Sequence, residues 1–514
     1  MSLINVTDLS FAYDGSADPV FEHASFNIDS RWKLGLIGRN GKGKTTLLNL
    51  LMGKYSYQGS ISSSVQFDYF PYKISESDLG RNAEELIDKW KPEVELWQVL
   101  VQLSGIGMDA ECLYRPFGTL SYGERTRVML AVLFAGENEM LLIDEPTNHL
   151  DISARESVKA FLKGKKGFIL VSHDRDLLDA VTDHVLVLNR ATIEVQAGNF
   201  SSWQENKEKN DAFAQAENEK HLKEIKKLKA SADRSSRWAA KSESSKIGFD
   251  PEKEHDRQMN ARSYIGSKTK KMQSRVGAFE KRIAREMKEK EGLLRDVEQV
   301  RELKIEPVRY HKDVLVSASD LSLAYDGAEP LFEGLRFEVR RGDRLFLSGP
   351  NGCGKSSIIK AVLEKAGVQL KNNEHTELNI SGDLTVGSGM IISYVSQDTS
   401  WMTGSLRDFA LERGLDESMF FSLVWLMGLE QEQFDRDISG FSEGQKKKVL
   451  VAASLLAKAH LYIWDEPLNY IDVISRMQIE KLLIKYKPTM LLVEHDVRFQ
   501  ENVATEILQI PAEN

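Results

Sequence analysis

The sequence predicts an α/β protein in which two copies of one domain are joined by a long α-helical hairpin. The first observation is that a set of motifs occurs twice along the 514 residues. The second is that short apolar runs alternate with helical patterns in each copy, which is typical of a largely parallel sheet covered by helices. The third is a segment rich in Glu, Lys and Ala between the copies, whose composition indicates a different structure.

The two copies form a tandem duplication, because their motifs keep register along the chain. The offset between matching residues is 311 at Gly38 and Gly349, and 321 at Asp144 and Asp465. Unrelated motifs would not stay in register in this way. We therefore expect three parts, in chain order: a first domain over 1–200, a linker over 201–311, and a second domain over 312–514.

The linker predicts two helical arms. Ser201–Ser235 and Lys268–Lys304 are rich in helix-forming residues and contain no Pro, whereas Gly248 and Pro251 between them break a helix. These positions place the tip of a hairpin near 241–260. A solvated spacer coiled coil is the alternative interpretation of the same pattern.

Charge is distributed unevenly along the chain. The whole chain carries −9, but the linker has 27 Lys+Arg and 20 Asp+Glu, a net of +7, which leaves −16 for the rest. A basic connector between two acidic blocks indicates an anionic partner for the connector.

The composition also excludes several classes of protein. No run of about 18 apolar residues is present, so no transmembrane helix is expected. The first residues lack the basic region and apolar core of a secretory signal. Cys112 and Cys353 are far apart, which excludes a disulfide framework or an iron–sulfur cluster and fits a reducing cytosol. We expect a cytoplasmic protein without a membrane segment.

Two glycine-rich loops match the pattern G-x-x-x-x-G-K-[ST], each after an apolar run and before a helical pattern. In such loops, glycines let backbone N–H groups turn toward phosphate oxygens, the lysine adds positive charge, and the hydroxyl of Thr45 or Ser356 can ligate Mg²⁺. The residues expected to hold nucleotide are Gly38, Arg39, Asn40, Gly41, Lys42, Gly43, Lys44, Thr45 and Thr46 in the first copy, and Gly349, Pro350, Asn351, Gly352, Cys353, Gly354, Lys355, Ser356 and Ser357 in the second.

A pair of acidic residues follows an apolar run in each copy: Asp144 and Glu145 after MLLI, and Asp465 and Glu466 after LYIW. This pattern predicts carboxylates at the carboxyl end of a buried strand, where α/β proteins place their sites. The first carboxylate of each pair can hold Mg²⁺, and the second can orient and deprotonate a water molecule. Adjacent acidic residues on a surface turn would have no such role.

The pentapeptides LSYGE (Leu120–Glu124) and FSEGQ (Phe441–Gln445) each precede a basic helical pattern. With the loops and carboxylates above, they resemble the motifs of ATP-binding cassette (ABC) ATPases, whose signature is an LSGGQ-like pentapeptide. The resemblance covers both copies and implies two ABC-type P-loop ATPase domains that bind ATP and Mg²⁺. It also implies a monomer in which each ATP lies between the two cassettes. The signature residues expected to close the sites are Ser442 and Gly444 at the Lys44 site, and Ser121 and Gly123 at the Lys355 site.

Further positions resemble elements of that family. Tyr13 and Tyr325 resemble the aromatic residue that stacks on adenine, although either could be a core tyrosine. His173 and His495 resemble the switch histidine that contacts the γ-phosphate, and each follows an apolar run. Asp151 and Asp472 resemble the ends of the D-loops.

The two copies differ at the Q-loop, the segment that provides a glutamine to the Mg²⁺ site in this family. Gln397 in SYVSQD resembles that glutamine and is expected among the Mg²⁺ ligands. Tyr72 stands at the matching position of the first copy. The difference indicates that the two sites hydrolyse ATP at unequal rates.

Two cassettes, a basic helical linker and the lack of a membrane segment together resemble the ABC-F group. Arg262–Arg275 and Asp465–Glu480 are similar to stretches of its antibiotic-resistance, ribosomal protection members of the Lsa/Vga type. The resemblance implies that the linker binds the ribosome, at large-subunit rRNA and the exit-site tRNA region, and extends toward the peptidyl-transferase centre. The implied function is protection from lincosamides, pleuromutilins and streptogramin A.

Other functions stay open at this point. A housekeeping ABC-F translation factor without a resistance role is the main alternative. A transporter ATPase subunit would need separate membrane partners and leaves the basic hairpin unexplained. A DNA-repair or chromosome-structuring ATPase would usually carry very long coiled coils or zinc-binding cysteines inside a cassette, and neither pattern is present.

Overall fold

The computed structural model describes residues 2–14, 19–136, 139–148, 150–188, 193–244, 281–282, 307–327, 329–368 and 378–511. The chain divides into two compact units. Met1–Trp203 and Glu302–Asn514 form the first unit, and Gln204–Arg301 form the second. Both copies of the repeat therefore lie in one unit.

The first cassette contains nine strands and six α-helices among its described residues. The strands are β1 (Leu3–Phe11), β2 (Phe21–Asp29), β3 (Lys33–Gly38), β4 (Gln58–Ser62), β5 (Gln66–Phe70), β6 (Glu139–Asp144), β7 (Phe168–Val171), β8 (His184–Leu188) and β9 (Ile193–Ala197). The helices are α1 (Lys44–Leu51), α2 (Ala83–Trp90), α3 (Leu96–Gly105), α4 (Tyr122–Leu133), α5 (Ile152–Lys163) and α6 (Arg175–Val181). An antiparallel sheet has the order β2-β1-β4, and a six-stranded sheet has the order β5-β6-β7-β3-β8-β9, parallel except for β9.

The second cassette repeats this arrangement. Its strands are β10 (Val314–Tyr325), β11 (Pro330–Arg340), β12 (Arg344–Ser348), β13 (Leu378–Val386), β14 (Ile392–Val395), β15 (Leu461–Asp465), β16 (Met490–Val493) and β17 (Glu506–Gln509). Its helices are α9 (Lys355–Lys365), α10 (Leu406–Glu412), α11 (Glu417–Leu426), α12 (Glu443–Leu456), α13 (Val473–Tyr486) and α14 (Val497–Val503). The antiparallel sheet has the order β11-β10-β13, and the parallel sheet has the order β14-β15-β16-β12-β17.

The central strands are largely apolar because both faces of each parallel sheet are covered. Every residue of β7 and of β15 is buried. In the first cassette, β3 and β6 each pair in parallel with β7, so the three carboxyl ends lie at one edge of the sheet. This topology brings the glycine-rich loop, Asp144 and His173 together, although they are far apart in the sequence.

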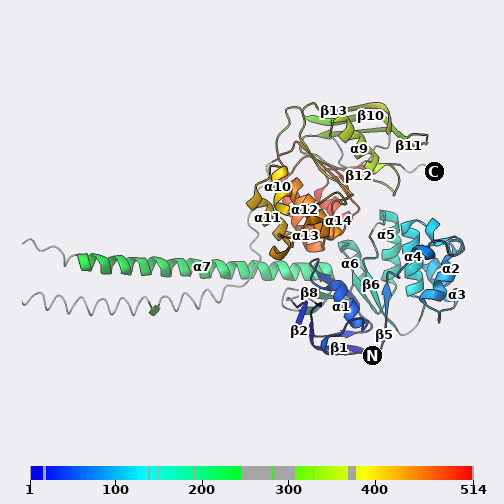
Figure 1. Cartoon of the computed structure of the whole chain (residues 1–514), viewed down its shortest axis with the longest axis horizontal. Helices are drawn as coiled ribbons and strands as arrows, with labels where there is room; N and C mark the ends of the chain where they lie inside the picture. The colour runs from blue at the N-terminus through cyan, green and yellow to red at the C-terminus, as the bar shows by residue number, and fades with distance from the viewer. Residues whose placement is uncertain are drawn as a thin grey trace, which may run out of the picture. The chain divides into compact units, whose positions relative to one another are not determined.

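A long helix, α7 (Phe200–Ser244), continues from the first cassette (Figure 1). Phe200 and Trp203 anchor its start, because both are buried in the core of that cassette. Farther along, Glu205 pairs with Lys209 and Glu219 with Lys223 across one helical turn, which favours a solvated helix. The predicted fold class is confirmed for two α/β domains with a long helix between them in the chain. Nearly all of the predicted tip at 241–260, and most of the second arm, lie outside the described residues.

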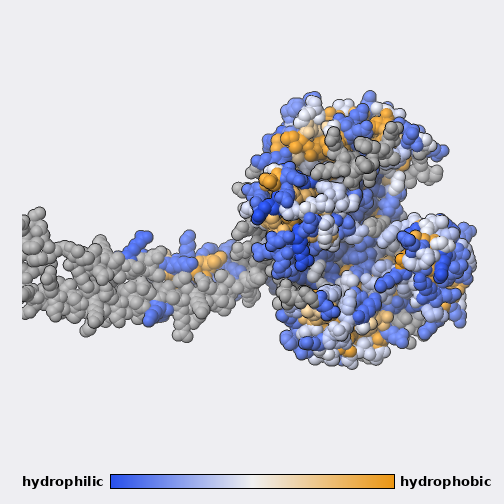
Figure 2. All heavy atoms as spheres, in the orientation of Figure 1, coloured by the Kyte–Doolittle hydropathy of each residue, from blue (hydrophilic) through white to orange (hydrophobic). Residues whose placement is uncertain are grey.

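Figure 2 shows mostly hydrophilic residues on the visible face of the cassettes, with small separate hydrophobic areas. Over the described ranges, no helix has both the length and the apolar character that crossing a membrane requires.

Candidate active site

Each glycine-rich loop joins a central strand to the helix that follows it. Gly43 precedes α1 with a φ of 88°, in the left-handed region that favours glycine. A Cβ atom there would lie 2.5 Å from Cγ1 of Val20, so a larger residue would also clash. The side chain of Lys44 folds over the loop, and its Nζ donates to the carbonyl of Gly38 at 2.8 Å. Lys355 does the same in the second cassette, where Nζ donates to Gly349 O at 2.8 Å.

The Lys44 site is a cavity of about 590 Å³ between the two cassettes. Asn40 Nδ2 donates to the backbone carbonyl of Tyr470 at 2.6 Å. A Cβ atom on Gly444 would lie 2.5 Å from that carbonyl oxygen, so the close approach requires glycine. The first cassette contributes the predicted residues Tyr13, Asn40, Gly41, Gly43, Lys44, Thr45, Thr46, Asp144, Glu145 and His173, and the second contributes Ser442 and Gly444.

The Lys355 site is a cavity of about 370 Å³. Its predicted lining residues are Tyr325, Asn351, Gly352, Gly354, Lys355, Ser356, Ser357, Gln397, Glu466 and His495. Ser121 and Gly123 do not line it, and a Cβ atom on Gly123 would meet Leu150 and Ala154 of its own cassette. The structure therefore brings the expected signature residues to the Lys44 site and not to the Lys355 site.

The remaining predicted loop residues support the loops or contact the other cassette. Arg39 Nη1 donates to the carbonyl of Leu426 at 3.2 Å, and Lys42 forms an ion pair with Glu430, so both cross between the cassettes. Pro350 O accepts from Lys355 at 2.7 Å. Cys353 is a buried free thiol, and its Sγ would be the first atom met by a Cβ on Gly349.

The two tyrosines expected at the adenine occupy matching places. The hydroxyl of Tyr13 hydrogen-bonds Oγ1 of Thr46 at 2.7 Å, and the hydroxyl of Tyr325 hydrogen-bonds Oγ of Ser357 at 2.9 Å. Both therefore lie against the first turn of the helix that follows the phosphate loop.

The hydroxyl and carboxyl groups expected to hold Mg²⁺ lie in contact in both cassettes, whereas Gln397 contacts Glu466. Thr45 Oγ1 donates to Asp144 Oδ2 at 2.9 Å, and Ser356 Oγ donates to Asp465 Oδ1 at 3.2 Å. Burial raises the pKa of Asp465 to about 6 and also raises the pKa of Asp144, so a cation there would offset the cost of each buried charge. Hydroxyl and carboxylate oxygens are ligands that Mg²⁺ accepts. This donor set fits the ion.

Glu145 and Glu466 have strained backbones, with φ values of 53° and 47°. Positive φ is costly for a residue other than glycine and concentrates at functional sites. In each case the backbone N–H continues the sheet by donating to the neighbouring strand, at 2.8 Å to Val171 O and 3.0 Å to Val493 O. This backbone conformation directs the side chain of Glu145 toward His173, and that of Glu466 toward His495.

The two glutamates have different electrostatic surroundings. Burial, together with the negative charge of Asp144, raises the pKa of Glu145 to about 8. Nε2 of His173 lies 3.3 Å from its Oε1. Burial opposes ionisation of Glu466 too, but His495 and Lys447 outweigh it and lower the pKa of that carboxyl.

Polar neighbours also distinguish the two glutamates. Gln397 Nε2 donates to Glu466 Oε2 at 3.0 Å, and Asn469 Nδ2 donates to the same atom at 2.6 Å. In the first cassette, Tyr72 stacks on Trp90 with ring centroids 5.0 Å apart, and its hydroxyl donates to Asp68. Tyr72 thus packs against Trp90 within the first cassette and does not line the Lys44 cavity.

Several residues of the sites were missed from the sequence. Tyr69 Oη donates to Asp144 Oδ2 at 3.1 Å. Lys447 Nζ donates to the backbone carbonyls of Ser396 and Glu466, at 2.8 and 3.3 Å. It thereby connects the Q-loop to the end of β15. The sequence contained a signal for Asn469, because both copies have an asparagine separated from the tripeptide DEP by one residue. No comparable signal pointed to Tyr69 or Lys447, whose roles depend on side-chain direction.

The fold and these sites define a tandem P-loop ATPase. The model of the ABC transporter family matches residues 21–148 and 332–469, just over half of the chain. The chain belongs to that family, as an ABC-F-type protein with two ABC ATPase domains that bind and hydrolyse ATP.

Relatives align over nearly the whole chain. The chain is 27% identical to the YdiF protein of Bacillus subtilis (strain 168), over 99% of this chain and 80% of YdiF. It is 26% identical to the ribosome protection protein VmlR of the same organism, over 98% of this chain and 86% of VmlR. Among solved structures, archaeal ribosome recycling factor aABCE1, crystallised with ribosomal stalk protein aP1, superposes with a TM-score of 0.61 at 19% identity. That match covers 98% of this chain and 88% of aABCE1.

Proposed function

We propose that this protein binds the ribosome and protects the peptidyl-transferase centre from antibiotics of the lincosamide, pleuromutilin and streptogramin A type. The observation that carries the proposal is the alignment with a ribosome protection protein over 98% of this chain, linker included. The net charge of +7 on residues 201–311 supports it, because Lys and Arg that neutralise rRNA phosphates supply affinity without sequence specificity. The protein then acts in the cytoplasm, with the linker directed at the exit-site tRNA region.

ATP controls this binding by bridging the cassettes. At the Lys44 site, the loop residues hold the phosphates from one side while Ser442 and Gly444 approach from the other. A ligand that contacts both halves stabilises the closed form over the open one, which is a shift in population. The closed form is the one that binds the ribosome with its linker inserted.

Hydrolysis reverses the shift. Glu145 and Glu466 orient and deprotonate the attacking water, and His173 and His495 contact the γ-phosphate. Thr45 with Asp144, and Ser356 with Asp465 and Gln397, would hold Mg²⁺, which would neutralise charge on the phosphates. Loss of the γ-phosphate removes contacts between the cassettes and releases the protein.

The proposal is tested with the double variant E145Q/E466Q and by drug susceptibility. Expression of the wild-type chain in a susceptible strain should raise the minimum inhibitory concentrations of these three drug classes. The double variant should co-sediment with ribosomes in the presence of ATP and hydrolyse it at least about 100-fold more slowly, as expected when a catalytic base is lost. Co-sedimentation without any change in susceptibility would identify a translation factor instead. No ATP-dependent co-sedimentation would refute ribosome binding.

A further inference from the structure

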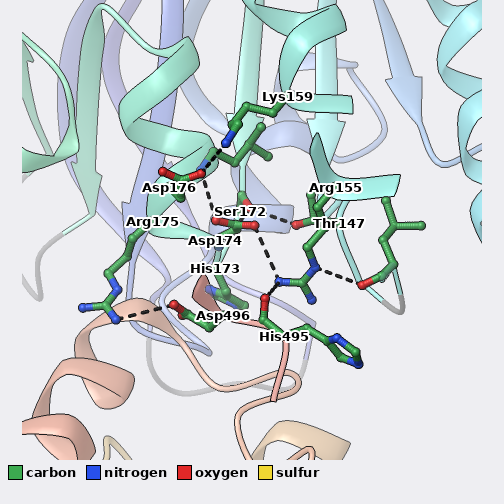
Figure 3. A network of polar contacts seen from close by, with 12 residues as sticks. Thr147, Arg155, Lys159, Ser172, His173, Asp174, Arg175, Asp176, His495 and Asp496 are labelled. Atoms are coloured by element: carbon green, nitrogen blue, oxygen red, sulfur yellow. Dashed lines mark hydrogen bonds and ion pairs between the residues drawn. The ribbon is translucent and has the colours of Figure 1, made fainter. Parts of the chain in front are cut away.

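Two arginines of the first cassette reach across the interface to the segment that carries His495 (Figure 3). Arg155, on α5, donates through Nη1 to the backbone carbonyl of His495 at 3.2 Å. Its Nε donates to Leu150 O at 3.0 Å, so the same side chain also fixes the D-loop of its own cassette. Arg155 lines the Lys355 cavity.

Arg175 makes the second crossing. It directly follows His173 and Asp174, and its Nη2 donates to Glu480 Oε2 at 2.7 Å. The same nitrogen lies 3.6 Å from Oδ1 of Asp496, the residue after His495. The side chain of Arg175 is 5% exposed and that of Asp496 is 3% exposed. A buried charge that loses its partner is strongly destabilising, so these groups hold one arrangement of the two segments.

The reverse contacts are not made by the matching residues of the second cassette. Arg476, which matches Arg155, donates to Ile471 O at 2.8 Å and to Asp496 Oδ2 at 3.1 Å, inside its own cassette. Val497 stands where the first cassette has Arg175. Lys159, which matches Glu480, pairs with Asp176 of its own cassette at 2.6 Å.

The His173 segment is held by contacts within the first cassette, including Arg155 Nη1, which lies 3.6 Å from Asp174 Oδ2. The backbone N–H of His173 donates to Glu145 Oε2 at 3.2 Å, and that of Asp174 donates to Ser172 Oγ at 3.1 Å. We propose that Arg155 and Arg175 are positioning residues for the Lys355 site. When the cassettes are closed, they hold the His495–Asp496 segment in the position that hydrolysis requires. Hydrolysis at the Lys355 site therefore depends on the first cassette, whereas the Lys44 site orders its own switch histidine. The inference deepens the proposed ATP cycle and rests on Glu145 and Glu466 being the catalytic carboxylates.

The experiment isolates each site with a glutamate variant. In an E145Q protein only the Lys355 site hydrolyses ATP, and in an E466Q protein only the Lys44 site does. Arg175→Met and, separately, Arg155→Met are introduced into both. The control is Arg498→Met, because Arg498 crosses the same interface in the other direction, pairing with Asp179 and donating to Ser201 Oγ at 3.3 Å.

In the E145Q protein, R175M and R155M should lower kcat about tenfold with the KM for ATP within about twofold, as expected when a catalytic group is misplaced. In the E466Q protein, R175M should leave kcat within about twofold of its parent. R155M should lower kcat there too, because Arg155 Nη1 also lies 3.6 Å from Asp174 Oδ2, next to His173. R498M should leave kcat unchanged in both. R175K keeps the charge and should restore at least half of the kcat that R175M loses. If the melting curve shows that R175M does not fold, R175K is used in its place.

Three results would overturn the inference. An equal fall of kcat in both parents with R175M, or a fall with R498M as large as with R175M, would assign the arginines to general interface stability. Full hydrolysis by the E145Q and E466Q parents would overturn the assignment of the glutamates, and the inference with it. Ribosome binding is not measured in this experiment, so its outcome is separate from that of the ribosome-protection proposal.

Discussion

At the scale of single residues, the two ATP sites share their strained glutamates but differ in what holds the carboxylates. Gln397 and Asn469 bind Glu466 directly, whereas the first cassette has Tyr72 packed away on Trp90. The hydroxyl of Tyr69 provides a polar contact there instead, and it goes to Asp144. The region of the Q-loop thus contacts the expected Mg²⁺ ligand in the first site and the expected catalytic glutamate in the second.

Removal of that hydroxyl tests this difference. In a Lys355→Ala protein, which leaves the Lys44 site to bind, Tyr69→Phe should weaken MgATP binding by about tenfold, because a hydrogen bond to a charged group contributes about 1.5–3 kcal/mol. Binding of a fluorescent ATP analogue is titrated with Mg²⁺ and with EDTA, and the loss should occur only with Mg²⁺. Tyr72→Phe is the matched control, since its hydroxyl donates to Asp68. Equal losses in the two variants would show that the Tyr69 contact is not specific.

At the scale of elements, the helices that follow the signature motifs begin in the same way. Ser121 accepts from the backbone N–H of Glu124, and Ser442 accepts from that of Gln445, each completed as a capping box by the third residue. Their surroundings differ, because Ser442 lines the Lys44 cavity and Ser121 lines neither cavity. The same capping motif therefore begins both α4 and α12, but only the start of α12 lines the cavity of the opposite phosphate loop.

Ser121→Ala and Ser442→Ala should separate capping from nucleotide binding. Each change removes one cap and should cost about 1 kcal/mol, which lowers the melting temperature of the nucleotide-free protein similarly in both variants. Only S442A should also reduce the rise in melting temperature on adding MgATP. A reduction of equal size in S121A would mean that the two signatures contribute alike.

At the scale of the whole molecule, the cassettes form one compact unit and Gln204–Arg301 form another. One contact that joins the cassettes is made by Asp472, which is held in its own cassette by Lys448, with Nζ 2.6 Å from Oδ2 and both side chains at most 1% exposed. Asp472 also accepts from the backbone N–H of Asn40 in the opposite phosphate loop, at 3.4 Å. The ATP sites are thus built within the first unit, without residues of the second lining either cavity.

Shortening of the linker should therefore separate hydrolysis from protection. With residues 241–282 replaced by a short Gly/Ser loop, ATP hydrolysis by the purified protein should stay within about twofold of wild type, because both sites lie in the other unit. Protection should fall to the level of an empty vector, measured as the minimum inhibitory concentration of a lincosamide. The control is the E145Q/E466Q protein, which keeps the linker and loses hydrolysis. Undiminished protection by the shortened chain would refute a role for the tip.

The sequence by itself determined the two α/β cassettes, the phosphate loops, the paired carboxylates and the long helix. These features depend on local patterns: a glycine that must have positive φ, a strand buried on both faces, a serine three residues before its capping partner. Only the tertiary structure decided that Ser121 lines neither site, that Tyr69 rather than Tyr72 contacts Asp144, and that Arg175 reaches Glu480. These contacts depend on how the cassettes pack and on the direction of each side chain. Arg175 and Glu480, which are 305 positions apart, leave no local pattern of their contact in the sequence.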